Sequence, residues 1–304
     1  MIDNVRFFAI NKDEFEQNVR DSGIMDFKAP YCVNTGEVLD YPKKGKLWNL
    51  DVNITKCTAF LNGSLHKFYN YYFNNEEHNY NDFNYNDLLR VISEIKFYTG
   101  INPLQTKITN LEFGFNIEVD KDPQEIIDKC VMMFNHKSPS KNLKYGGRGD
   151  YKEFELTDYN IKIYNKSKQY GTSKYILRVE IKIRMKRILE RLEIFNLNDL
   201  MDKSKLSKLF WFFIDKIEKL HIIDEFEHRK DIPKRDMDKL VKYTSSFHWA
   251  IILRKPQKVK NIHINEFEKL IRKYNLDELK DEILLQLLNK FHQLLEPELK
   301  HVET

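Results

Sequence analysis

Tyr164 and Glu180 lie among basic residues in the segment IKIYNKSKQYGTSKYILRVEIKIR, residues 161–184. Between Lys162 and Arg187 the sequence has nine Lys or Arg residues, and Glu180 is the one acid. A tyrosine phenol has a pKa of about 10 and is a weak nucleophile at neutral pH, but nearby ammonium groups or a metal ion favour its phenolate. These residue types permit two interpretations: a solvated basic hairpin, or a nucleophile, Tyr164, that faces an acid at Glu180.

Three segments near these residues alternate apolar and polar side chains with a period of two, which predicts strands with one apolar and one polar face. They are residues 108–119 and the segments around Ile161 and Ile176. If the three strands pair in one sheet, their apolar faces cover helices and their polar faces form a single surface. That surface would carry Glu112 from the first strand, Lys162, Tyr164 and Lys166 from the second, and Arg178, Glu180 and Lys182 from the third.

The chemistry of this surface depends on how close its two acids lie. Directly opposed residues on neighbouring strands have Cβ atoms about 4.5–5.5 Å apart, and two carboxylates at that distance repel unless a cation lies between them. Mg²⁺ prefers such oxygen ligands and polarises a phosphate oxygen, while Lys and Arg bind the flanking phosphates. Together these parts suit transesterification of a DNA phosphodiester onto Tyr164. Each residue alone also has a simpler interpretation: Glu180 as an exposed ion pair, and Tyr164 as an aromatic residue that favours strands.

The composition is that of a polar globular protein. The chain has 304 residues, of which 41% are hydrophobic and 32% charged, and its net charge of +4 is compatible with an acidic partner without establishing one. Three widely spaced cysteines, Cys32, Cys57 and Cys130, favour a reducing cytosol over a disulfide framework or a zinc cluster. The N-terminal residues lack the apolar run of a signal peptide, and no stretch approaches the roughly 20 apolar residues of a membrane helix. We therefore expect a cytoplasmic protein without a membrane partner.

The order of the predicted elements indicates an α+β fold: a central antiparallel sheet with helices on one face, followed by a mostly helical C-terminal region. Caps and glycines mark helices over 11–23 and 86–100, and an acid followed by proline marks a third over 122–134. We expect further strands over 5–10 and 48–61, a loop over 24–46 and a turn over 144–151.

The pattern of the chain changes near residue 184. Residues 1–184 mix strands and helices and contain the tyrosine and both acids, whereas residues 185–304 have apolar residues at helical spacing. We therefore divide the chain into a catalytic part, 1–184, and a helical C-terminal part, 185–304. A basic stretch from His228 to His263 makes DNA contact one role for the second part, and recruiting a partner or capping the fold are others.

Residues 63–88 form an unusual segment that is rich in Asn and Tyr and contains His66 and His78. Either histidine could be a metal ligand, but a polar histidine in a surface loop is the simpler interpretation. The aromatic residues of the segment could stack on unpaired bases, an interaction worth about 1–3 kcal/mol per base, although packing is the commoner role of such a cluster. These aromatic residues are Phe68, Tyr69, Tyr71, Tyr72 and Phe73.

Several segments, in order along residues 1–210, resemble the replication initiators of filamentous phages. NGSLHKF followed by EHNYNDF is similar to that family's small-residue, Lys and Gly-His-Asn segment, with Glu77 in place of the glycine. TKITNLEFGFN is similar to its Arg-Ile-Asp strand, with Asn110 and Glu112 in place of Arg and Asp. NIKIYNKSKQY resembles the segment with the nucleophilic tyrosine, and YILRVEIKIRMKRILERLEIFNLNDL resembles the Arg-Phe-Glu strand and the helix after it. The last two segments also resemble those of rolling-circle plasmid initiators of Gram-positive bacteria.

The resemblance implies an HUH-like Rep nickase fold and an enzyme that starts rolling-circle replication by nicking and joining origin DNA, either single-stranded or in a cruciform. It implies that Tyr164 attacks the scissile phosphate, holds the 5′ end as a phosphotyrosine and frees a 3′-OH. The His-hydrophobic-His triplet with which many tyrosine nickases bind metal is missing from the sequence. The resemblance assigns metal binding to Glu112, Glu180 and His78, for Mg²⁺ or Mn²⁺, and phosphate neutralisation to Lys166 and Arg178.

Two other functions stay open on the sequence. A DNA-binding protein without catalysis, for copy control or partition of a phage or plasmid, would use the basic stretch 228–263, and a structural protein of a mobile element is the third choice. The acid pair distinguishes them, because a phosphate binder has no use for Glu112 and Glu180 on a basic face. A host helicase and a second copy of the chain are further partners that the resemblance allows, in the cytoplasm of a bacterial host.

Overall fold

The computed structural model describes residues 1–145 and 149–297, and a nine-stranded sheet lies at the centre of these residues. Its strands follow the order β2-β3-β4-β1-β5-β10-β9-β8-β7, and each pair of neighbours is antiparallel. Two further strands, β6 and β11, pair in a separate ribbon. The strands are β1 Ile2–Ala9, β2 Lys43–Leu47, β3 Leu50–Ile54, β4 Ala59–Ser64, β5 Thr106–Glu118, β6 Val131–Phe134, β7 Lys141–Tyr145, β8 Gly149–Glu155, β9 Tyr159–Asn165, β10 Ile176–Ile183 and β11 Leu220–Ile222.

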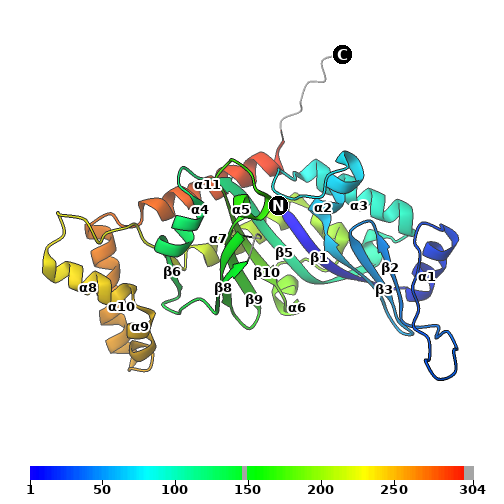
Figure 1. The fold of residues 1–304 in the computed structure, drawn as a ribbon, viewed down its shortest axis with the longest axis horizontal. Coiled ribbons are helices and arrows are strands. Elements are labelled where there is room, and N and C mark those ends of the chain that lie inside the picture. The colour runs from blue at the N-terminus through cyan, green and yellow to red at the C-terminus, as the bar shows by residue number, and fades with distance from the viewer. Residues whose placement is uncertain (146–148, 298–304) are drawn as a thin grey trace, which may run out of the picture.

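Helices flank this sheet and make up most of the C-terminal part (Figure 1). The antiparallel sheet and the helical C-terminal part confirm the predicted α+β class. No helix in the described ranges is both long and apolar enough to cross a membrane. The α-helices are α1 Lys12–Asp21, α2 Leu65–Tyr69, α3 Tyr85–Thr99, α4 Pro123–Glu125, α5 Lys166–Tyr170, α6 Lys186–Arg191, α7 Lys203–Ile217, α8 Lys234–Thr244, α9 Ser246–Ile252, α10 Gln257–Lys273 and α11 Glu278–Leu295.

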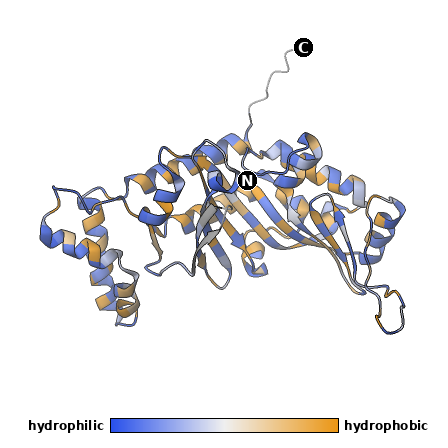
Figure 2. Ribbon diagram, in the orientation of Figure 1, coloured by the Kyte–Doolittle hydropathy of each residue, from blue (hydrophilic) through white to orange (hydrophobic). Residues whose placement is uncertain are grey.

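The apolar face of the sheet packs against α7 and α11. Hydropathy alternates along the long strands, as Figure 2 shows, and every second residue of β5 from Leu111 to Ile117 is apolar. Phe113 and Phe115 of β5 are fully buried and contact Phe213 of α7 at ring-centroid distances of 5.7 Å each. Phe210 of α7 stacks on Phe291 of α11 at 4.1 Å, which ties the last long helix to the same core. Burial of these aromatic residues leaves the opposite, polar face of the strands available for the site.

Helices α8, α9 and α10 form a second, smaller core. They lie together at one end of the molecule in Figure 1, beyond β6 and away from the long strands. Their contacts centre on Trp249, which packs against Tyr243 and Phe267 and is fully buried. The helical C-terminal part therefore contributes to two cores, because α7 and α11 pack on the sheet while α8–α10 pack on each other.

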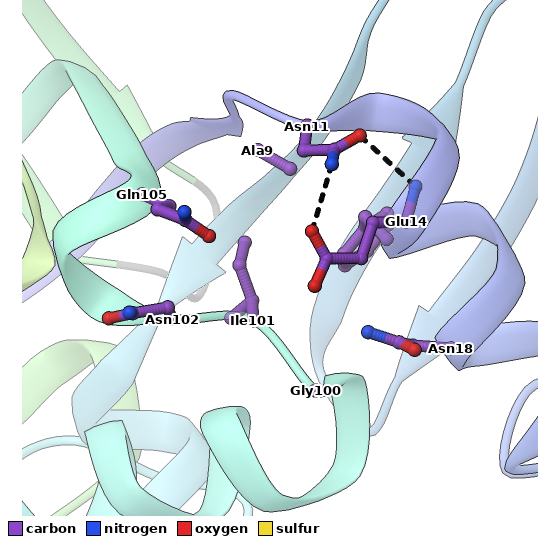
Figure 3. A pocket seen from close by; sticks show the side chains of 9 residues that line it. Ala9, Asn11, Glu14, Asn18, Gly100, Ile101, Asn102 and Gln105 are labelled. Carbon is purple, nitrogen blue, oxygen red and sulfur yellow. Dashed lines mark hydrogen bonds between the residues drawn. The ribbon is translucent and has the colours of Figure 1, made fainter.

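Local sequence signals explain the helix ends near β1. Asn11 caps α1 by accepting a hydrogen bond from the Glu14 backbone N–H at 3.2 Å, and its side-chain amide donates to the Glu14 carboxylate at 2.9 Å. Gly100 ends α3 at a φ of +66°, and a Cβ there would collide with the side chain of Asn18. Figure 3 shows the small pocket between these two helix ends. None of the polar residues of the candidate site described below lines it.

Most of the predicted elements are confirmed, with shifts of a few residues at their ends. The predicted strand over 48–61 is wrong, because the chain folds back at Thr55–Thr58 and forms the hairpin of β3 and β4. The backbone N–H of Thr55 donates to the Thr58 carbonyl at 2.7 Å, and the turn contains no glycine or proline. The alternation of apolar and polar residues continues through the turn, so the sequence pattern does not reveal it.

The prediction also fails in three other places. The helix predicted over 122–134 is only α4 and a short π-helix, and its last residues form the strand β6. The predicted loop over 24–46 ends in the strand β2. Of the turn predicted over 144–151, residues 144–145 and 149–151 belong to the paired strands β7 and β8, and residues 146–148 lie outside the described residues.

Candidate active site on the polar face of the sheet

The strand register places the predicted tyrosine and both acids on one face. Arg178 of β10 lies opposite Tyr164 of β9, and Glu180 of β10 lies opposite Lys162 of β9. On the other side of β10, Lys182 lies opposite Glu112 of β5. Directly opposed residues point to the same side of a sheet, and residues two apart on one strand do so as well. The predicted shared polar surface is therefore present in the structure.

Tyr164 lies within hydrogen-bond distance of an acid and an amine. Its hydroxyl donates to Glu180 Oε2 at 3.3 Å, and Lys166 Nζ lies 3.4 Å from the same hydroxyl. Two ammonium groups also lie near its ring, with Lys162 Nζ at 4.9 Å and Lys166 Nζ at 5.3 Å from the centroid. These neighbours give the phenol a proton acceptor and a cationic surrounding.

The protonation of Tyr164 differs from the sequence-based expectation. Burial raises the pKa of Tyr164 well above 10, the charge of Glu180 raises it further, and Arg178 acts in the opposite direction without prevailing. We expected the neighbouring cations to favour the phenolate. They do not outweigh burial here, because several of them are already paired with carboxylates. Without a further cation, Tyr164 is a protonated phenol at neutral pH.

Arg178 joins three strands at the site. Its guanidinium donates to Glu180 Oε2 at 3.0 Å, to Asp3 Oδ2 at 3.1 Å and to Asn116 Oδ1 at 3.2 Å. The residue is 2% exposed, so these bonds replace water around a full charge. Three strands, β1, β5 and β10, are thereby joined at one guanidinium.

Asp3 is a buried member of the site that the sequence analysis did not include. A register shift in the pairing of β1 with β5 lies between Ile2 and Val5, so two residues of β1 lie opposite Glu112. Asp3 consequently points to the polar face, where it accepts hydrogen bonds from Arg178, Asn79 and Ser64. Burial acts to raise the pKa of Asp3, but Arg178 and Lys166 outweigh it, and the carboxyl titrates well below its ordinary range.

Asn79 connects this acid to the tyrosine strand. Its amide nitrogen donates to Asp3 Oδ2 at 2.9 Å, and its amide oxygen accepts from Lys166 Nζ and from the Tyr170 hydroxyl, both at 2.7 Å. Its backbone carbonyl accepts from Asn116 Nδ2 at 3.0 Å. Since every polar group of the side chain is used, Asn79 fixes the position of Lys166 relative to the sheet.

Lys166 is a buried amine with an unusual protonation equilibrium. It is the first residue of α5, which Asn165 caps by accepting from the Lys168 N–H, and it is 1% exposed. Burial lowers the pKa of Lys166 to about 7, and the charge of Arg178 contributes to the same shift. Both the amine and the ammonium are therefore populated near neutral pH.

The two predicted metal-binding acids are near each other, but each has a cationic partner. Glu112 pairs with Lys182 at 2.6 Å, and Glu180 pairs with Arg178 at 3.0 Å. Burial and then the charge of Glu180 raise the pKa of Glu112, which shows that the negative charge here is incompletely compensated. Within the described residues, no group of three or more His, Cys, Asp or Glu is arranged to hold a metal ion. Two carboxylates thus supply hard oxygen donors for a divalent cation, and the part of the chain that the structure describes arranges no third ligand with them.

Neither histidine contacts these acids in the described structure. His78 pairs with Glu76 at 2.9 Å and stacks on Tyr80 at a ring-centroid distance of 4.0 Å. His66 is 3% exposed, has its Nε2 2.7 Å from Asn81 Oδ1 and stacks on Phe83. Burial lowers the pKa of His66 to about 3, so it is a neutral core residue.

The aromatic residues of the same segment are largely packed. Phe68 is fully buried, and Tyr72 lies against Trp48 at a ring-centroid distance of 4.7 Å. Tyr69 is half-buried and contacts Phe73 at 5.0 Å. Packing is therefore the role of these rings in the structure, whereas Tyr71 of the same segment is exposed.

Gly114 leaves space for the Glu180 side chain, because it has no side chain of its own. It lies opposite Glu180 on the polar face of β5, and a Cβ at this position would lie 2.5 Å from Cβ of Glu180. Any other residue would push the Glu180 side chain away from Arg178 and Tyr164. Glycine is thus required here by the close approach of a neighbouring strand.

Comparison with known proteins gives little further information. No family model and no curated protein matches the chain. Among solved structures, the chain is similar to a rolling circle replication initiator protein from Geobacillus stearothermophilus, with 12% identity and a TM-score of 0.38 over 88% of this chain and 96% of that one. A likeness at this level carries no argument about function, which must be argued from the geometry of the chain itself.

The sequence analysis missed residues that reach the site from outside the three strands. Asp3 precedes the predicted strand over 5–10, so its facing was never considered. Asn79 was matched to a family segment without being assigned a role, and Tyr170 lies in the connection between the two strands of the predicted hairpin, which in the structure contains α5. Asn116 was visible as a polar-face residue of its strand, two residues from Gly114, and could have been included on that signal.

The pKa of Lys166 predicts a pH dependence of stability. Between about 7 and its ordinary value of 10.5, the folded protein binds fewer protons than the unfolded chain, so the free energy of unfolding rises with pH. We expect the Lys166→Met variant to lack this contribution, which has a slope of up to about 1.4 kcal/mol per pH unit. Urea unfolding at several pH values between 7 and 10 measures the slope. Lys96→Met, at an exposed position of α3, is the control, and equal slopes in wild type and Lys166→Met would contradict the assignment.

Proposed function

We propose that this protein is a metal-dependent DNA nicking and joining enzyme that initiates rolling-circle replication through Tyr164. The supporting observation is the tyrosine hydroxyl itself, which lies 3.3 Å from Glu180 Oε2 and 3.4 Å from Lys166 Nζ on a face that also carries Glu112. A surface ion pair or a strand-forming aromatic does not need this surrounding of buried acids and amines. The resemblance of the segments around Tyr164 and Glu180 to replication initiators agrees with this geometry.

The reaction is a transesterification at one phosphodiester. The Tyr164 oxygen forms a bond to the scissile phosphorus, and the bond from phosphorus to the 3′ oxygen breaks. The products are a 5′-phosphotyrosine on the enzyme and a free 3′-OH that can prime synthesis. The reverse attack by a 3′-OH rejoins the strand, so the energy of the phosphodiester is retained.

Lys166 is suited to move the proton of this reaction. Its neutral amine, populated because its pKa is about 7, can accept the Tyr164 proton at the 3.4 Å distance observed. The resulting ammonium can then return the proton to the 3′ oxygen as that oxygen leaves. Asn79 holds the amine in place for both steps by its 2.7 Å hydrogen bond.

Arg178 acts as a positioning residue in this proposal. The sequence analysis assigned it to phosphate neutralisation, but its donors are occupied by Glu180, Asp3 and Asn116. It would hold Glu180 beside the tyrosine. Lys162, which is half-buried on the same face, is then the cation that meets the phosphate, and Lys166 becomes a second one once it has accepted the Tyr164 proton.

The proposed metal would be held by Glu112 and Glu180. The raised pKa of Glu112 supports this, because a divalent cation would stabilise the ionised carboxylate. Mg²⁺ is commonly bound by one or two carboxylates together with substrate phosphates, so the absence of a third protein ligand among the described residues fits a site that DNA completes. When bound, Mg²⁺ or Mn²⁺ would polarise the phosphate and favour the phenolate. His78 stays a candidate ligand only if its segment moves.

The partners follow from the same proposal. Origin DNA is the substrate, residues 1–184 carry the chemistry, and residues 185–304 act in DNA binding or as an accessory part in the bacterial cytoplasm. A host helicase and a second copy of the chain are further candidates. A DNA-binding protein without catalysis is the alternative, and the buried carboxylates beside Tyr164 count against it.

We expect Tyr164→Phe to reduce covalent adduct formation by at least about 10³-fold, because the nucleophile is removed. The test incubates the full chain with single-stranded origin DNA and Mn²⁺ and separates the products on a denaturing gel. DNA labelled at its 3′ end should migrate with the protein, and DNA labelled at its 5′ end should appear as a shorter strand. Binding of uncleaved DNA should be unchanged.

The matched control is Tyr175→Phe, a half-exposed tyrosine next to β10 that should keep full activity. If Tyr164→Phe still forms the adduct, the nucleophile is another residue and Tyr170 is the next candidate. If wild-type protein binds the DNA but forms no adduct with any metal, the alternative of a binding protein without catalysis is correct.

Removal of either acid should weaken metal binding. We expect Glu112→Ala and Glu180→Ala to raise the Mn²⁺ concentration for half-maximal adduct formation by at least about tenfold. Electron paramagnetic resonance of Mn²⁺ with protein and uncleavable DNA gives a readout that does not depend on activity. Glu118→Ala, an exposed acid further along β5, is the control. Unchanged Mn²⁺ titrations in both test variants would remove the proposed site.

A further inference from the structure

A groove on the polar face of β2, β3 and β4 lies several strands away from β9, the strand that carries Tyr164. Its floor includes Phe60, Asn53 and Asn62, and the segment around Lys28 lines one side. Lys44 and Lys46 of β2 line it as well. No part of the proposed reaction uses these residues.

The groove belongs to the same face of the sheet as the candidate active site. Asn62 of β4 lies opposite Arg6 of β1, and Arg6 lies opposite Asn110 of β5. Asn110 has the same facing as Glu112, two residues further along β5. Between β4 and β9 there are four strand spacings, or roughly 19 Å across the strands, which a few nucleotides of extended chain can span.

The side chains of the groove suit unpaired bases. Phe60 and Phe8 are half-buried neighbours with ring centroids 5.3 Å apart, and the Arg6 guanidinium lies 4.1 Å from the Phe60 centroid. Aromatic rings of this kind stack on bases, and arginine adds a cation–π contribution.

The rim of the groove suits phosphates. Lys28, Lys44 and Lys46 are exposed, and Lys107 adds a further exposed cation opposite Phe8. Two acids also line the groove: Asp26 is exposed, and Asp51 lies 3.8 Å from Lys46 in a solvent-exposed pair that is weakly held. Cations around an aromatic floor are the arrangement by which proteins bind single-stranded nucleic acid.

We propose that the β2–β4 groove binds unpaired bases of the single DNA strand that flanks the scissile phosphate. The inference rests on the proposed function for its substrate, and it adds a binding site some distance from the chemistry. The continuity of the face, the cations of the rim and the contact of Arg6 with the neighbouring rings of Phe8 and Phe60 favour DNA over a peptide. Phe60 acts as the base-stacking residue, and Lys44 and Lys46 bind the backbone.

The test measures binding of fluorescein-labelled dT20 to the full chain by anisotropy, with EDTA present so that no chemistry occurs. We expect Phe60→Ala to weaken binding about tenfold, and Lys44→Ala to weaken it and lower the salt dependence by about one released ion. Phe97→Ala is the control, because Phe97 is a 76% exposed phenylalanine of α3 outside the groove. An abasic 20-mer should compete poorly with dT20 on wild type.

Lys46→Ala, at a side chain that is 70% exposed, keeps the test valid if Phe60→Ala does not fold. Wild-type affinity for dT20 in the Phe60 and both lysine variants overturns the proposal. Equal competition by dT20, the abasic strand and a 20-base-pair duplex overturns it too, because the groove would then bind only backbone.

The proposed binding groove and the proposed nicking reaction can be contradicted separately. At saturating DNA, Phe60→Ala should still form the Tyr164 adduct, so loss of Phe60-dependent binding alone would leave the reaction intact. If binding depends on Phe60 but the protein forms no adduct, the groove is a DNA-binding site and the proposed nicking function is wrong.

Discussion

The buried guanidinium of Arg178 is the constraint on which the arrangement of the site depends. A full charge that is 2% exposed must have its donors satisfied, and the three acceptors come from Asp3 of β1, Asn116 of β5 and Glu180 of β10. Removing one acceptor of such a buried pair typically costs about 3–5 kcal/mol, because the other charge is left without compensation. The register of three strands and the position of Glu180 beside Tyr164 are therefore fixed together.

This organisation has a chemical cost and a chemical use. The burial that holds the carboxylates in place also raises the pKa of Tyr164, so the resting phenol is a poorer nucleophile than a solvated one. The same burial lowers the pKa of Lys166 to about 7 and creates a proton acceptor 3.4 Å from the phenol oxygen. In the proposed reaction the site is incomplete until DNA and a divalent cation enter. That dependence would keep the nucleophile inactive away from its substrate.

The sequence predicted the site well where alternation is regular and poorly where the backbone departs from it. The common facing of Glu112, Tyr164 and Glu180 followed from period two in the regular stretches of three strands, and the structure confirms it. Asp3 could not be found in this way, because a bulge in β1 turns it to the polar face. Asn79 arrives from a segment without regular structure, and the turn at Thr55–Thr58 lacks the glycine or proline that would mark a hairpin. Hydrogen bonds between residues far apart in the sequence fix the positions of Asp3 and Asn79, and a local sequence pattern carries no information about such bonds.

The central claim is that the Tyr164 oxygen forms the bond to DNA, and the most direct test is the identity of the residue that carries the nucleotide. Wild-type protein is reacted with single-stranded origin DNA and Mn²⁺, digested with nuclease and protease, and the modified peptide is sequenced by mass spectrometry. We expect a 5′-phosphonucleotide on Tyr164 in the peptide that contains IKIYNK. A nucleotide on Tyr170, on a serine or on any other side chain would contradict it.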